Sequence, residues 1–374
     1  MSPHPDTAEA RSLVIGASGL VGGYLLRHLA GRGERPFALS RTPRAGSEAS
    51  WLVGDLQKAE MLNVPAVATL FCTADAVLLA RVLPHLFQST LKRVVVFSST
   101  SVMTKLDSEV AGERESLRAL AAAEQSIVRA CEANQTGWTI LRPTLIYAEG
   151  RDTNITPLSR LIRRFGFMPL VGGANGLRQP VHAEDLVIGA IKAARSPAAA
   201  NKFYALPGGE TIPYKEMIGR IFDGMKLPRR TIAVPALVWR AGFVGAKPLF
   251  PGANVAMGIR MMKDMTFDAT PANHRFWLER AHLPSALRLT REPRNSRPMS
   301  GQRTQPRLSD CVPVASPDDA RHLSPAGKMT SKPCPRQWSK CYLSGPGGLC
   351  DWRLEHLCRA DQDGPVSARR LTAF

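Results

Sequence analysis

Short apolar runs alternate with amphipathic stretches from the N-terminus to about residue 268. Six runs that are rich in β-branched and aromatic residues predict strands: RSLVI, RPFALSR, WLVGDL, VATLFC, KRVVVF and GWTILRP. The segments between them repeat apolar residues at helical spacing, as Leu25, Leu26 and Leu29 do after the first run. Strands that alternate with helices form parallel sheets, so the pattern predicts an α/β fold with a doubly wound, Rossmann-like parallel sheet.

The pattern changes near residue 285. Beyond Ala286 the chain is rich in Pro, Ser and Arg without apolar periodicity, which is typical of a segment that cannot repay the entropy of ordering. An alternative is that the stretch from HRFWLER onward is an out-of-frame translation of a GC-rich gene. The expected organisation is a cofactor-binding domain over 11–285, with a small substrate domain from about 150–180 and 205–265, and a disordered tail over 286–374.

The positions of the cysteines indicate whether a metal site is expected, and the first residues indicate the cellular compartment. Five of the seven cysteines lie in the tail, at spacings that match no zinc pattern: Cys311, Cys334, Cys341, Cys350 and Cys358. No metal site is predicted, and Cys72 and Cys131 are expected to be ordinary buried residues. The start MSPHPDTAEARS lacks a signal-peptide core, and no 18-residue apolar run occurs. A cytoplasmic protein without stable membrane insertion is therefore expected.

The formal net charge of +18 raises the question of a nucleic-acid partner. From residue 285 onward the chain carries 15 basic and 8 acidic residues, and the remaining excess is scattered rather than clustered. A phosphorylated small molecule or simple solubility accounts for such a charge as well as DNA does. No nucleic-acid partner is expected.

A glycine-rich turn joins the first predicted strand to the first predicted helix. Gly16 permits a tight turn, Gly19 lets the backbone approach a pyrophosphate, and Gly22 lets the helix sit close to the strand. Phosphates would then lie on free N–H groups at the positive end of the helix. In this strand–turn–helix context the motif predicts a dinucleotide site. The expected contacts are Gly16, Ser18, Gly19, Leu20, Val21 and Gly22.

The end of the second predicted strand bears on cofactor choice. An NAD site usually has an acid there for the ribose 2′-hydroxyl, whereas this chain has Arg41, with Arg44 close behind. A guanidinium suits a 2′-phosphate, so NADP(H) is favoured over NAD(H), although Arg41 as a solvated loop charge stays an alternative. Ends of later strands complete the predicted cofactor site with Asp55, Leu56, Thr73, Ser98 and Pro143.

Together these motifs resemble the extended short-chain dehydrogenase/reductase superfamily, and more narrowly its NAD-dependent epimerase/dehydratase family. The resemblance rests on GASGLVG at 16–22, SSTS at 98–101, LRPTLIY at 141–147 and RQPVHAEDL at 178–186, and covers roughly residues 11–270. It implies a Rossmann-like cofactor domain, a small substrate domain and a nucleotide-sugar substrate. It also implies that Arg178 approaches a substrate phosphate, and that His182 and Asp185 shape the wall of the substrate domain.

The family's chemistry uses a tyrosine with a lysine four residues later, and this chain lacks that pair. The positive charge of the lysine lowers the pKa of the phenol, so that the phenol can exchange a proton at neutral pH. None of the tyrosines Tyr24, Tyr147, Tyr204, Tyr214 and Tyr342 has a lysine at that spacing. The best alignment to the pair is Leu120-x-x-x-Glu124. Glu124 falls in the apolar stripe of its helix, so it is expected to face inward, either as an acid–base group or held by a backbone amide or an arginine.

Three further side chains are candidates for the missing chemistry. Ser99 and Thr100 are expected to hydrogen-bond a substrate carbonyl, and neither hydroxyl is an acid near neutral pH without help. Lys105 either supplies the missing positive charge above the nicotinamide or is a solvated loop residue.

The segment after the sixth strand carries several guanidiniums. Arg160, Arg163 and Arg164 fit the wet face of a helix whose residues Leu158, Leu161, Ile162 and Phe165 face inward. Asn154 and Arg178 are the better candidates for binding an anionic substrate, together with Thr100. The apolar stretch AVPALVWRAGFVGAKPLF leaves open an exposed patch for a homodimer or a lipid-linked ligand.

Two functions follow from these expectations. The first is an NAD(P)-binding, epimerase/dehydratase-like oxidoreductase for a sugar nucleotide or similar polar carbonyl or alcohol, with Ser99, Lys105 and Glu124 in place of the Tyr/Lys pair. The second is a non-catalytic NADP(H)-binding sensor or assembly protein.

Overall fold

A computed structural model describes residues 11–148, 150–246 and 255–277 of the chain. The chain divides into two units, 1–293 with 372–374 and 294–371, and all described residues belong to the first. The predicted boundary near residue 285 and the predicted tail lie outside the described residues.

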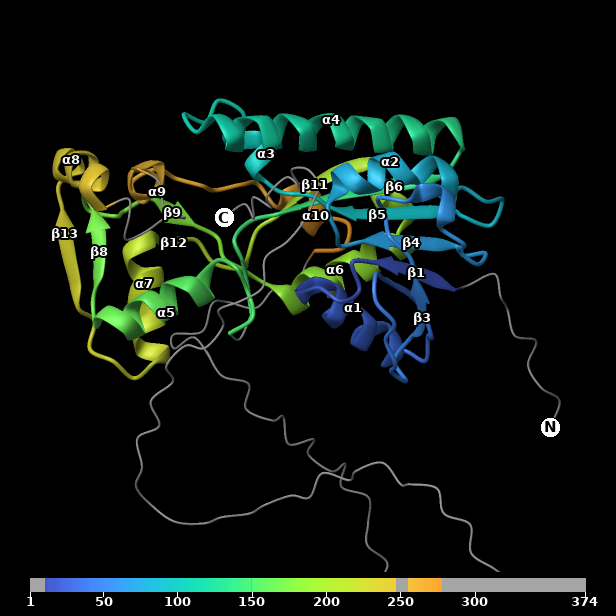
Figure 1. Cartoon of the computed structure of the whole chain (residues 1–374), viewed down its shortest axis with the longest axis horizontal. Coiled ribbons are helices and arrows are strands. Elements are labelled where there is room, and N and C mark those ends of the chain that lie inside the picture. Colours follow the sequence, from blue (N-terminus) through green and yellow to red (C-terminus); the bar gives the residue numbers. More distant parts are fainter. Residues whose placement is uncertain (1–10, 149, 247–254, 278–374) are drawn as a thin grey trace, which may run out of the picture. The chain divides into compact units, whose positions relative to one another are not determined.

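A seven-stranded parallel sheet is the centre of the described structure (Figure 1). Its order is β11-β6-β5-β4-β1-β2-β3. The strands are β1 (Ser12–Ile15), β2 (Phe37–Ser40), β3 (Ser50–Val53), β4 (Thr69–Cys72), β5 (Arg93–Phe97), β6 (Gly137–Pro143) and β11 (Lys202–Leu206). Six of them are the predicted strands. The seventh, β11, was not predicted, and it pairs in parallel with β6 from Lys202 opposite Thr139 to Leu206 opposite Pro143.

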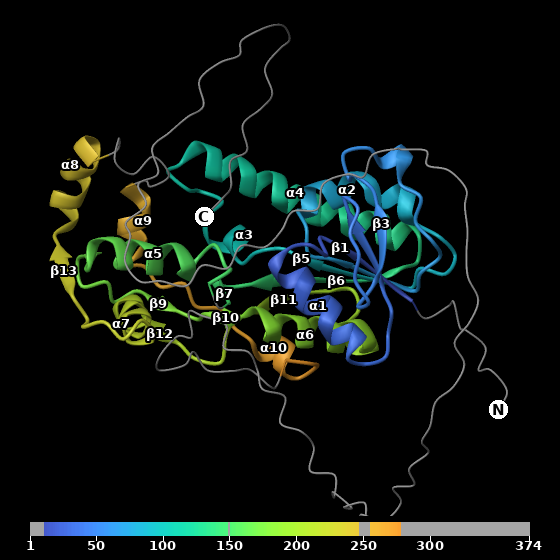
Figure 2. The ribbon, with the colours of Figure 1, turned by 60° about the horizontal axis from the view of Figure 1, so that its bottom comes forward.

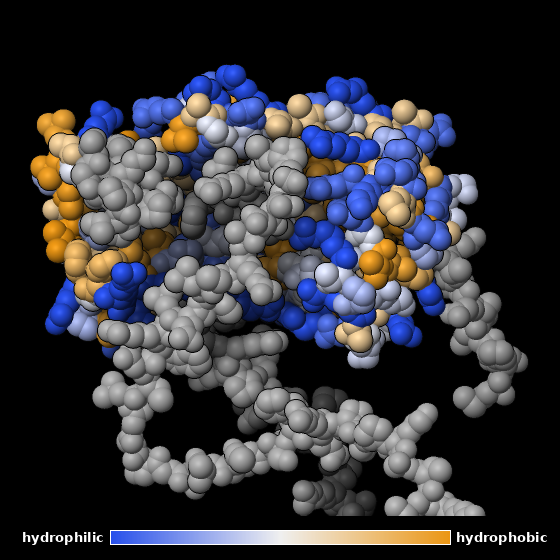
Figure 3. Space-filling view, in the orientation of Figure 1, coloured by the Kyte–Doolittle hydropathy of each residue, from blue (hydrophilic) through white to orange (hydrophobic). Residues whose placement is uncertain are grey.

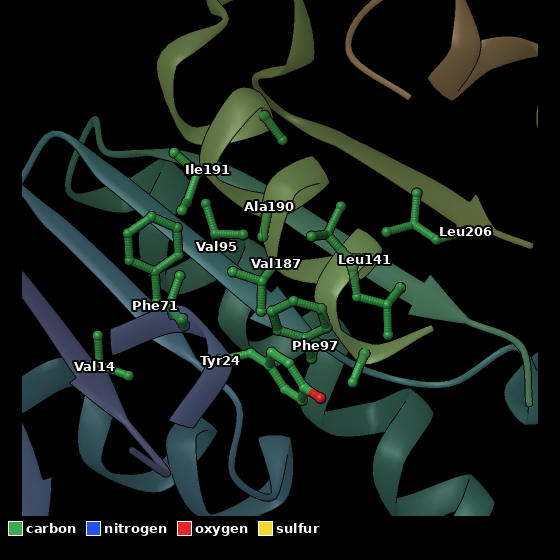
Figure 4. Close-up of a cluster of buried hydrophobic side chains, with 14 of the residues drawn as sticks. Val14, Tyr24, Phe71, Val95, Phe97, Leu141, Val187, Ala190, Ile191 and Leu206 are labelled. Atoms are coloured by element: carbon green, nitrogen blue, oxygen red, sulfur yellow. The ribbon is translucent and has the colours of Figure 1, made fainter. Parts of the chain in front are cut away.

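Helices cover both faces of this sheet, which confirms the doubly wound fold. Successive strand residues point to opposite faces, and in β1 the side chains of Leu13, Val14 and Ile15 are all at most 1% exposed. Val14 packs with α1 (Leu20–Ala30) and α6 (Ala183–Arg195), whereas Leu13 and Ile15 pack with α2 (Ala76–Leu86) and α4 (Ala111–Ala133). Figure 2 shows the two helix pairs on opposite sides, and Figure 4 shows the first cluster.

A smaller part of the fold is built from segments on either side of α6 and β11. It contains the short strand pairs β7 (Ile146–Tyr147) with β10 (Val181–His182), β9 (Leu177–Arg178) with β12 (Ile212–Pro213), and β8 (Met168–Val171) with β13 (Thr231–Val234). Its helices are α5 (Ile155–Phe165), α7 (Tyr214–Gly224), α8 (Ala236–Ala246) and α9 (Val255–Arg260). A separate buried cluster that includes Ile162, Met217 and Phe222 forms its core. Most of these elements fall within about 150–180 and 205–265, and the role of those segments as a substrate domain stays a prediction.

The amphipathic pattern of α5 was predicted correctly except at its end. Arg160, Arg163 and Arg164 are exposed and Ile162 is fully buried, as expected. Phe165, however, is 44% exposed, because the helix ends there at the left-handed Gly166 (φ 75°). Its ring lies beside that of Phe167, with a centroid distance of 6.5 Å.

The last described residues pack on α6, beside the seven-stranded sheet. After α10 (Thr270–Asn273), the indole of Trp277 packs on Gly189 of α6, so closely that a Cβ there would lie 2.1 Å from the ring. Its Nε1 donates to the carbonyl of Pro207 at 3.1 Å. Phe276 and Trp277, which belong to the stretch HRFWLER, are therefore part of the folded core.

Candidate cofactor site

The turn after β1 has the conformation that the glycine motif predicts. Gly16 has φ +79°, and a Cβ at this position would lie 2.6 Å from the backbone nitrogen of Ala74. The Gly19 amide donates to the Gly16 carbonyl at 2.9 Å, which closes the turn. A side chain at position 16 would therefore be both strained and sterically blocked.

Gly22 lies where α1 meets this turn. A Cβ on Gly22 would lie 2.3 Å from the Gly16 carbonyl oxygen, while one on Gly23 would have its nearest neighbour, Arg27 Nη1, at 4.0 Å. The close packing of α1 on the turn therefore depends on Gly22 and not on Gly23. The first amides of a helix have no intrahelical acceptor and point outward at its positive end. The bare backbone around Gly19, which begins α1, thus fits a diphosphate group.

A cavity of about 260 Å³ opens beside this turn, at the carboxyl ends of β4, β5 and β6. Four predicted cofactor residues line it, namely Val21, Thr73, Ser98 and Pro143. The remaining lining residues are Ala74, Asp75, Phe97, Leu120 and Ile146. The structure thus brings together residues that are far apart in the sequence, at the edge where doubly wound folds bind ligands.

Two hydroxyls in this cavity differ in their hydrogen bonding. Thr73 Oγ1 lies 3.1 Å from the carbonyl oxygens of both Ile15 and Gly16, so it holds β4 against the glycine turn. Ser98 Oγ is buried and has no hydrogen-bond partner among the described residues. A buried hydroxyl without a partner is costly, and a polar ligand in the cavity would satisfy it.

The helix position that corresponds to the missing tyrosine also faces this cavity. Leu120 of α4, which the expected alignment sets against the family's tyrosine, lines it with an aliphatic side chain. One turn later, Glu124 is 1% exposed and binds Arg142 through both oxygens, with Nε to Oε1 at 3.0 Å and Nη2 to Oε2 at 2.5 Å. Glu124 faces inward as predicted, and its partner is an arginine.

The hydroxyls of Ser99 and Thr100, which follow β5, form hydrogen bonds with main-chain groups of the fold. Ser99 Oγ accepts from the Ser101 amide at 3.1 Å, at the start of α3 (Ser101–Thr104). Thr100 was expected to contact substrate, but it is 6% exposed and its Oγ1 donates to the Pro143 carbonyl at 3.0 Å. This hydroxyl joins the segments that follow β5 and β6, and a contact of Thr100 with substrate stays a prediction.

Lys105 lies in a charged cluster outside the residues that line the cavity. Its Nζ is 3.6 Å from Glu113 Oε1, and Glu113 also accepts from Ser108 Oγ at 2.5 Å and from Arg260 of α9. Burial and the nearby charge of Arg260 lower the pKa of Lys105, an effect that the Glu113 carboxylate opposes. Lys105 is therefore a partly buried, paired residue rather than a solvated one.

Arg178 was expected to meet a substrate phosphate, and the structure gives its guanidinium other partners. It is 5% exposed, with Nη1 donating at 2.7 Å to the carbonyls of Leu177 and Lys263 and Nη2 donating at 2.5 Å to that of Arg260. This guanidinium holds the segment after α9 in place, and a contact of Arg178 with a substrate phosphate stays a prediction.

The start of α5 depends on a residue that the sequence analysis did not select. Asp152 is buried, and its Oδ1 accepts from the amides of Asn154 and Thr156 at 2.9 and 3.1 Å. Asn154 Nδ2 donates to the Ile146 carbonyl at 2.8 Å, so this amide group is engaged within the fold. Asp75, also missed, caps α2 by accepting from Val77 at 2.8 Å. An acid directly before an apolar helical run signals such a cap.

The adenosine end of the predicted site lies at β2 and β3. Arg41 is exposed immediately after β2, and Arg44 Nε lies 3.3 Å from Ser40 Oγ. Asp55 follows β3, and its Oδ1 accepts from the Gln57 amide at 3.0 Å. Leu56 packs partly against the core. Because β2 and β3 continue the sheet beyond β1, these residues lie at the same edge as the glycine turn.

His182 and Asp185 flank the start of α6. The ring of His182 lies edge-on to those of Tyr147 and Tyr24, at centroid distances of 5.1 and 5.7 Å, and its Nδ1 accepts from the Glu184 amide at 3.3 Å. Asp185 is 9% exposed.

Other chemistries find little support in the described part of the chain. Burial raises the pKa of the Cys72 and Cys131 thiols to about 12, which leaves both unreactive. Among the described residues, no group of three or more His, Cys, Asp or Glu side chains is arranged to hold a metal ion. None of the described helices combines the length and the hydropathy needed to cross a bilayer.

Comparison with curated proteins identifies two relatives, and no family model matches the chain. Both relatives are described as NADH dehydrogenase [ubiquinone] 1 alpha subcomplex subunit 9, mitochondrial. The Arabidopsis thaliana protein is 30% identical over 138 residues, which are 36% of this chain and 33% of that protein. The Dictyostelium discoideum protein is 28% identical over 86 residues, 23% of this chain and 24% of that protein. The matched regions thus span about a third or less of these relatives.

Solved structures match over a larger share. UDP-glucose 4-epimerase from Thermotoga maritima, with UDP-glucose, has a TM-score of 0.56 and 14% identity over 75% of this chain and 97% of that chain. UDP-glucuronic acid 4-epimerase from Bacillus cereus, with UDP-glucuronic acid and NAD, has a TM-score of 0.56 and 11% identity over 73% of this chain and 94% of that chain. dTDP-glucose 4,6-dehydratase from Bacillus anthracis, with NAD, has a TM-score of 0.54 and 13% identity over 75% of this chain and 94% of that chain. The chain therefore has the fold of these epimerases and of this dehydratase.

Proposed function

We propose that the chain binds a nicotinamide dinucleotide at the carboxyl edge of its sheet. The observation that carries this proposal is the space reserved for backbone at Gly16 and Gly22, where a Cβ would collide with main-chain atoms at 2.6 and 2.3 Å. Such packing presents the first amides of α1 to a diphosphate. The unpartnered Ser98 hydroxyl at the other end of the site suits the polar nicotinamide half.

We favour a non-catalytic role for the bound cofactor. Leu120 has no proton to exchange, Glu124 is bound to Arg142 through both oxygens, and Lys105 pairs with Glu113. A protein of this fold that has the glycine turn but no proton donor is suited to binding the cofactor as a structural ligand, or to sensing it. The names of the two curated relatives, which are subunits of NADH dehydrogenase, agree with a role in a larger assembly.

The cofactor proposed is NADP(H) rather than NAD(H). Arg41 is exposed at the end of β2, where an acid would select an unphosphorylated ribose, and Arg44 lies on the same loop. Two guanidiniums suit a 2′-phosphate. The epimerase and dehydratase neighbours whose descriptions name a cofactor contain NAD, so binding measurements on this chain decide the preference.

The second candidate is hydride transfer at a sugar nucleotide or similar anionic carbonyl or alcohol. It is favoured by the sugar-nucleotide complexes among the structural neighbours and by the Ser98 hydroxyl in the cavity. In this case Ser99 would hydrogen-bond the reacting oxygen, Lys105 would supply positive charge, and Glu124 would exchange protons after leaving Arg142.

Fluorescence titration of the full chain with NADPH and NADH tests the cofactor proposal. We expect saturable binding of both, with NADPH at least ~10-fold tighter. Loss of binding in Gly22→Ala, with retention in Gly23→Ala, would assign the binding to the glycine turn. Absence of binding to either cofactor would refute the proposal.

A turnover assay then separates the two candidates. The loaded protein is incubated with UDP-glucose, UDP-glucuronic acid and dTDP-glucose, and the products are separated by chromatography. Tight cofactor binding without product supports the non-catalytic role. Product formation that disappears in Glu124→Gln, in a protein that still binds cofactor, establishes the enzymatic role instead.

A cytoplasmic location is proposed because Cys72 and Cys131, the cysteines within the described residues, are free and buried, and a reducing compartment keeps thiols in that state. Fractionation of cells that express the chain from its own gene, followed by immunoblotting, tests this. Recovery in an organelle would contradict it.

A further inference from the structure

One end of the smaller part of the fold exposes large apolar side chains. On α8, Leu237 is 80% and Val238 58% exposed, and on β13 Ile232 is 51% exposed. Phe165 and Phe167, beside the start of β8, are 44% and 37% exposed. We call these five residues the β13–α8 surface. Figure 3 shows hydrophobic residues gathered over α8 and along β13.

The register of β13 explains why Ile232 is exposed. Thr231 and Ala233 line a cavity against α7, so Ile232 points to the opposite face of the strand. An ordinary surface helix hides its apolar side chains, whereas α8, ALVWRAGFVGA, has a single charged residue, Arg240. Apolar groups of this size that gather on one face mark an interaction site.

The two chain segments that carry the surface hold charges of one sign. The segments 155–169 and 226–246 contain seven basic residues and no acidic residue: Arg160, Arg163, Arg164, Lys226, Arg229, Arg230 and Arg240. All seven are exposed, and we call them the basic ring. Among the described residues, carboxylates form ion pairs with Arg229 and with no other member of the ring. Six positive charges are therefore left for a negatively charged partner.

This arrangement disfavours a second copy of the chain. A two-fold contact through the surface would bring two basic rings together, and like charges repel at such distances. Pairing of two β13 edges is also hindered, because Arg230 precedes the strand and Pro235, which lacks an N–H, follows it. The occupant should instead be anionic.

The shape of the surface favours lipid over an acidic protein. Leu237 and Val238 are neighbours at the start of α8 and both protrude, and the nearby cavity is lined by other residues. A protein partner would need a complementary pocket for them, whereas the interfacial region of a bilayer accepts protruding side chains without one. Basic residues next to such side chains add attraction to anionic headgroups.

We propose that the β13–α8 surface docks reversibly on an anionic phospholipid membrane. The apolar side chains enter the interfacial region, and the basic ring contacts lipid phosphates. This attachment is peripheral, and it does not depend on a bound dinucleotide.

Co-sedimentation of the full chain with vesicles tests the proposal. We expect binding to vesicles of phosphatidylcholine with phosphatidylglycerol that weakens at high ionic strength, and little binding to phosphatidylcholine alone. Leu237→Asp with Val238→Asp should reduce the binding by at least ~10-fold. The matched control, Val53→Asp with Met61→Asp, alters residues that are 63% and 71% exposed elsewhere and should bind like the parent chain.

A charge-reversed pair gives an independent test should the apolar variant fold poorly. Arg230→Glu with Arg240→Glu should lose binding to the anionic vesicles, while Arg118→Glu with Arg129→Glu, on the exposed side of α4, should retain it. Thermal unfolding and NADPH titration of each variant show whether the fold is intact.

Three results would overturn the proposal. Binding that persists in both surface variants would place the contact elsewhere, for example in the basic residues beyond 285. Equal binding to neutral and anionic vesicles would remove the role of the basic ring. A dimer of the parent chain in analytical ultracentrifugation that becomes monomeric in Leu237→Asp with Val238→Asp would identify a second copy as the occupant.

Discussion

Glu124 and Arg142 form a two-point ion pair between α4 and β6. The carboxylate accepts from Nε at 3.0 Å and from Nη2 at 2.5 Å, and the same guanidinium lies over the ring of Phe203 at 4.5 Å. Glu124 is 1% exposed, whereas Arg142 retains 18% of its side-chain exposure. The pair therefore anchors the helix that carries Leu120 to the sheet beneath it.

Removal of the Glu124 charge should cost stability. Glu124→Gln leaves the Arg142 guanidinium without its counter-charge, and we expect the free energy of unfolding to fall by about 2 kcal/mol, since breaking a buried pair by one partner is costly. Urea denaturation measures this. The exposed Glu132→Gln, on the same helix, should change it by less than about 0.5 kcal/mol. An unchanged stability together with lost turnover would instead favour an acid–base role for Glu124.

Neighbouring glycines of α1 should respond in opposite directions to alanine. In Gly22→Ala the new Cβ meets the Gly16 carbonyl, and we expect a loss of about 1–3 kcal/mol with loss of cofactor binding. In Gly23→Ala the space is open, and better helix propensity should raise stability by up to about 1 kcal/mol. Thermal unfolding with and without NADPH reports both effects. Equal behaviour of the two variants would contradict the close packing inferred for Gly22.

Two hydroxyls after β5 should separate binding from stability. Ser98→Ala removes a buried group without a partner, so stability should hold or rise by about 1 kcal/mol while NADPH affinity falls ~3–10-fold. Thr100→Val removes the hydrogen bond to Pro143, so stability should fall by about 1 kcal/mol with affinity unchanged. Urea denaturation and fluorescence titration together check this contrast. Loss of stability in Ser98→Ala would show that its hydroxyl has a structural partner.

Acid should weaken the contact that Glu113 makes between α4 and α9. Burial opposes ionisation of Glu113, but hydrogen bonds from Arg260 and Ser108 and the charges of Lys105 and Arg260 outweigh it and lower its pKa below the usual 4.5. A lowered folded-state pKa contributes stability above 4.5 that is lost as the pH falls through the folded value.

We therefore expect Glu113→Gln to be less stable than the parent above pH 4.5, with a difference that shrinks on further acidification. Urea midpoints measured across this range test it. Glu109→Gln, in the exposed loop before α4, should show no such pH-dependent difference. A difference that grows at low pH would have the wrong sign for this pair.

Arg41 should decide between the two dinucleotides. Arg41→Ala should weaken the binding of NADPH by ~10-fold and leave the affinity for NADH nearly unchanged, because only NADPH carries a 2′-phosphate. Arg35→Ala, an exposed arginine before β2, serves as the control. Parallel titrations measure the ratio. An unchanged ratio in Arg41→Ala would identify Arg41 as a solvated loop charge.

Local signals in the sequence predicted much of the framework. The strands were recognisable because burial on both faces makes them continuously apolar, as in the run before Ser98. The conformation at Gly16 and the packing at Gly22 followed from spacing alone, since only backbone fits there. The inward direction of Glu124 followed from helical periodicity, and its open alternative of an arginine partner agrees with the observed Arg142.

Roles that depend on distant segments could not be predicted. Arg178 donates to the carbonyls of Arg260 and Lys263, which are 82 and 85 positions away in the chain. Lys105 is paired because Glu113 and Arg260 meet beside it. The strand β11 was missed because it lies at the edge of the sheet, where only Tyr204 and Leu206 are buried and the run is not continuously apolar.

The packing of Trp277 on Gly189 has a consequence for folding during biosynthesis. The seven-stranded sheet is complete at Leu206, at the end of β11, yet α6 leaves space beside Gly189 that Trp277 fills. Domains that fold during translation normally complete themselves from their own continuous sequence. Here we expect the packing around α6 to become native only after residue 277 has left the ribosome.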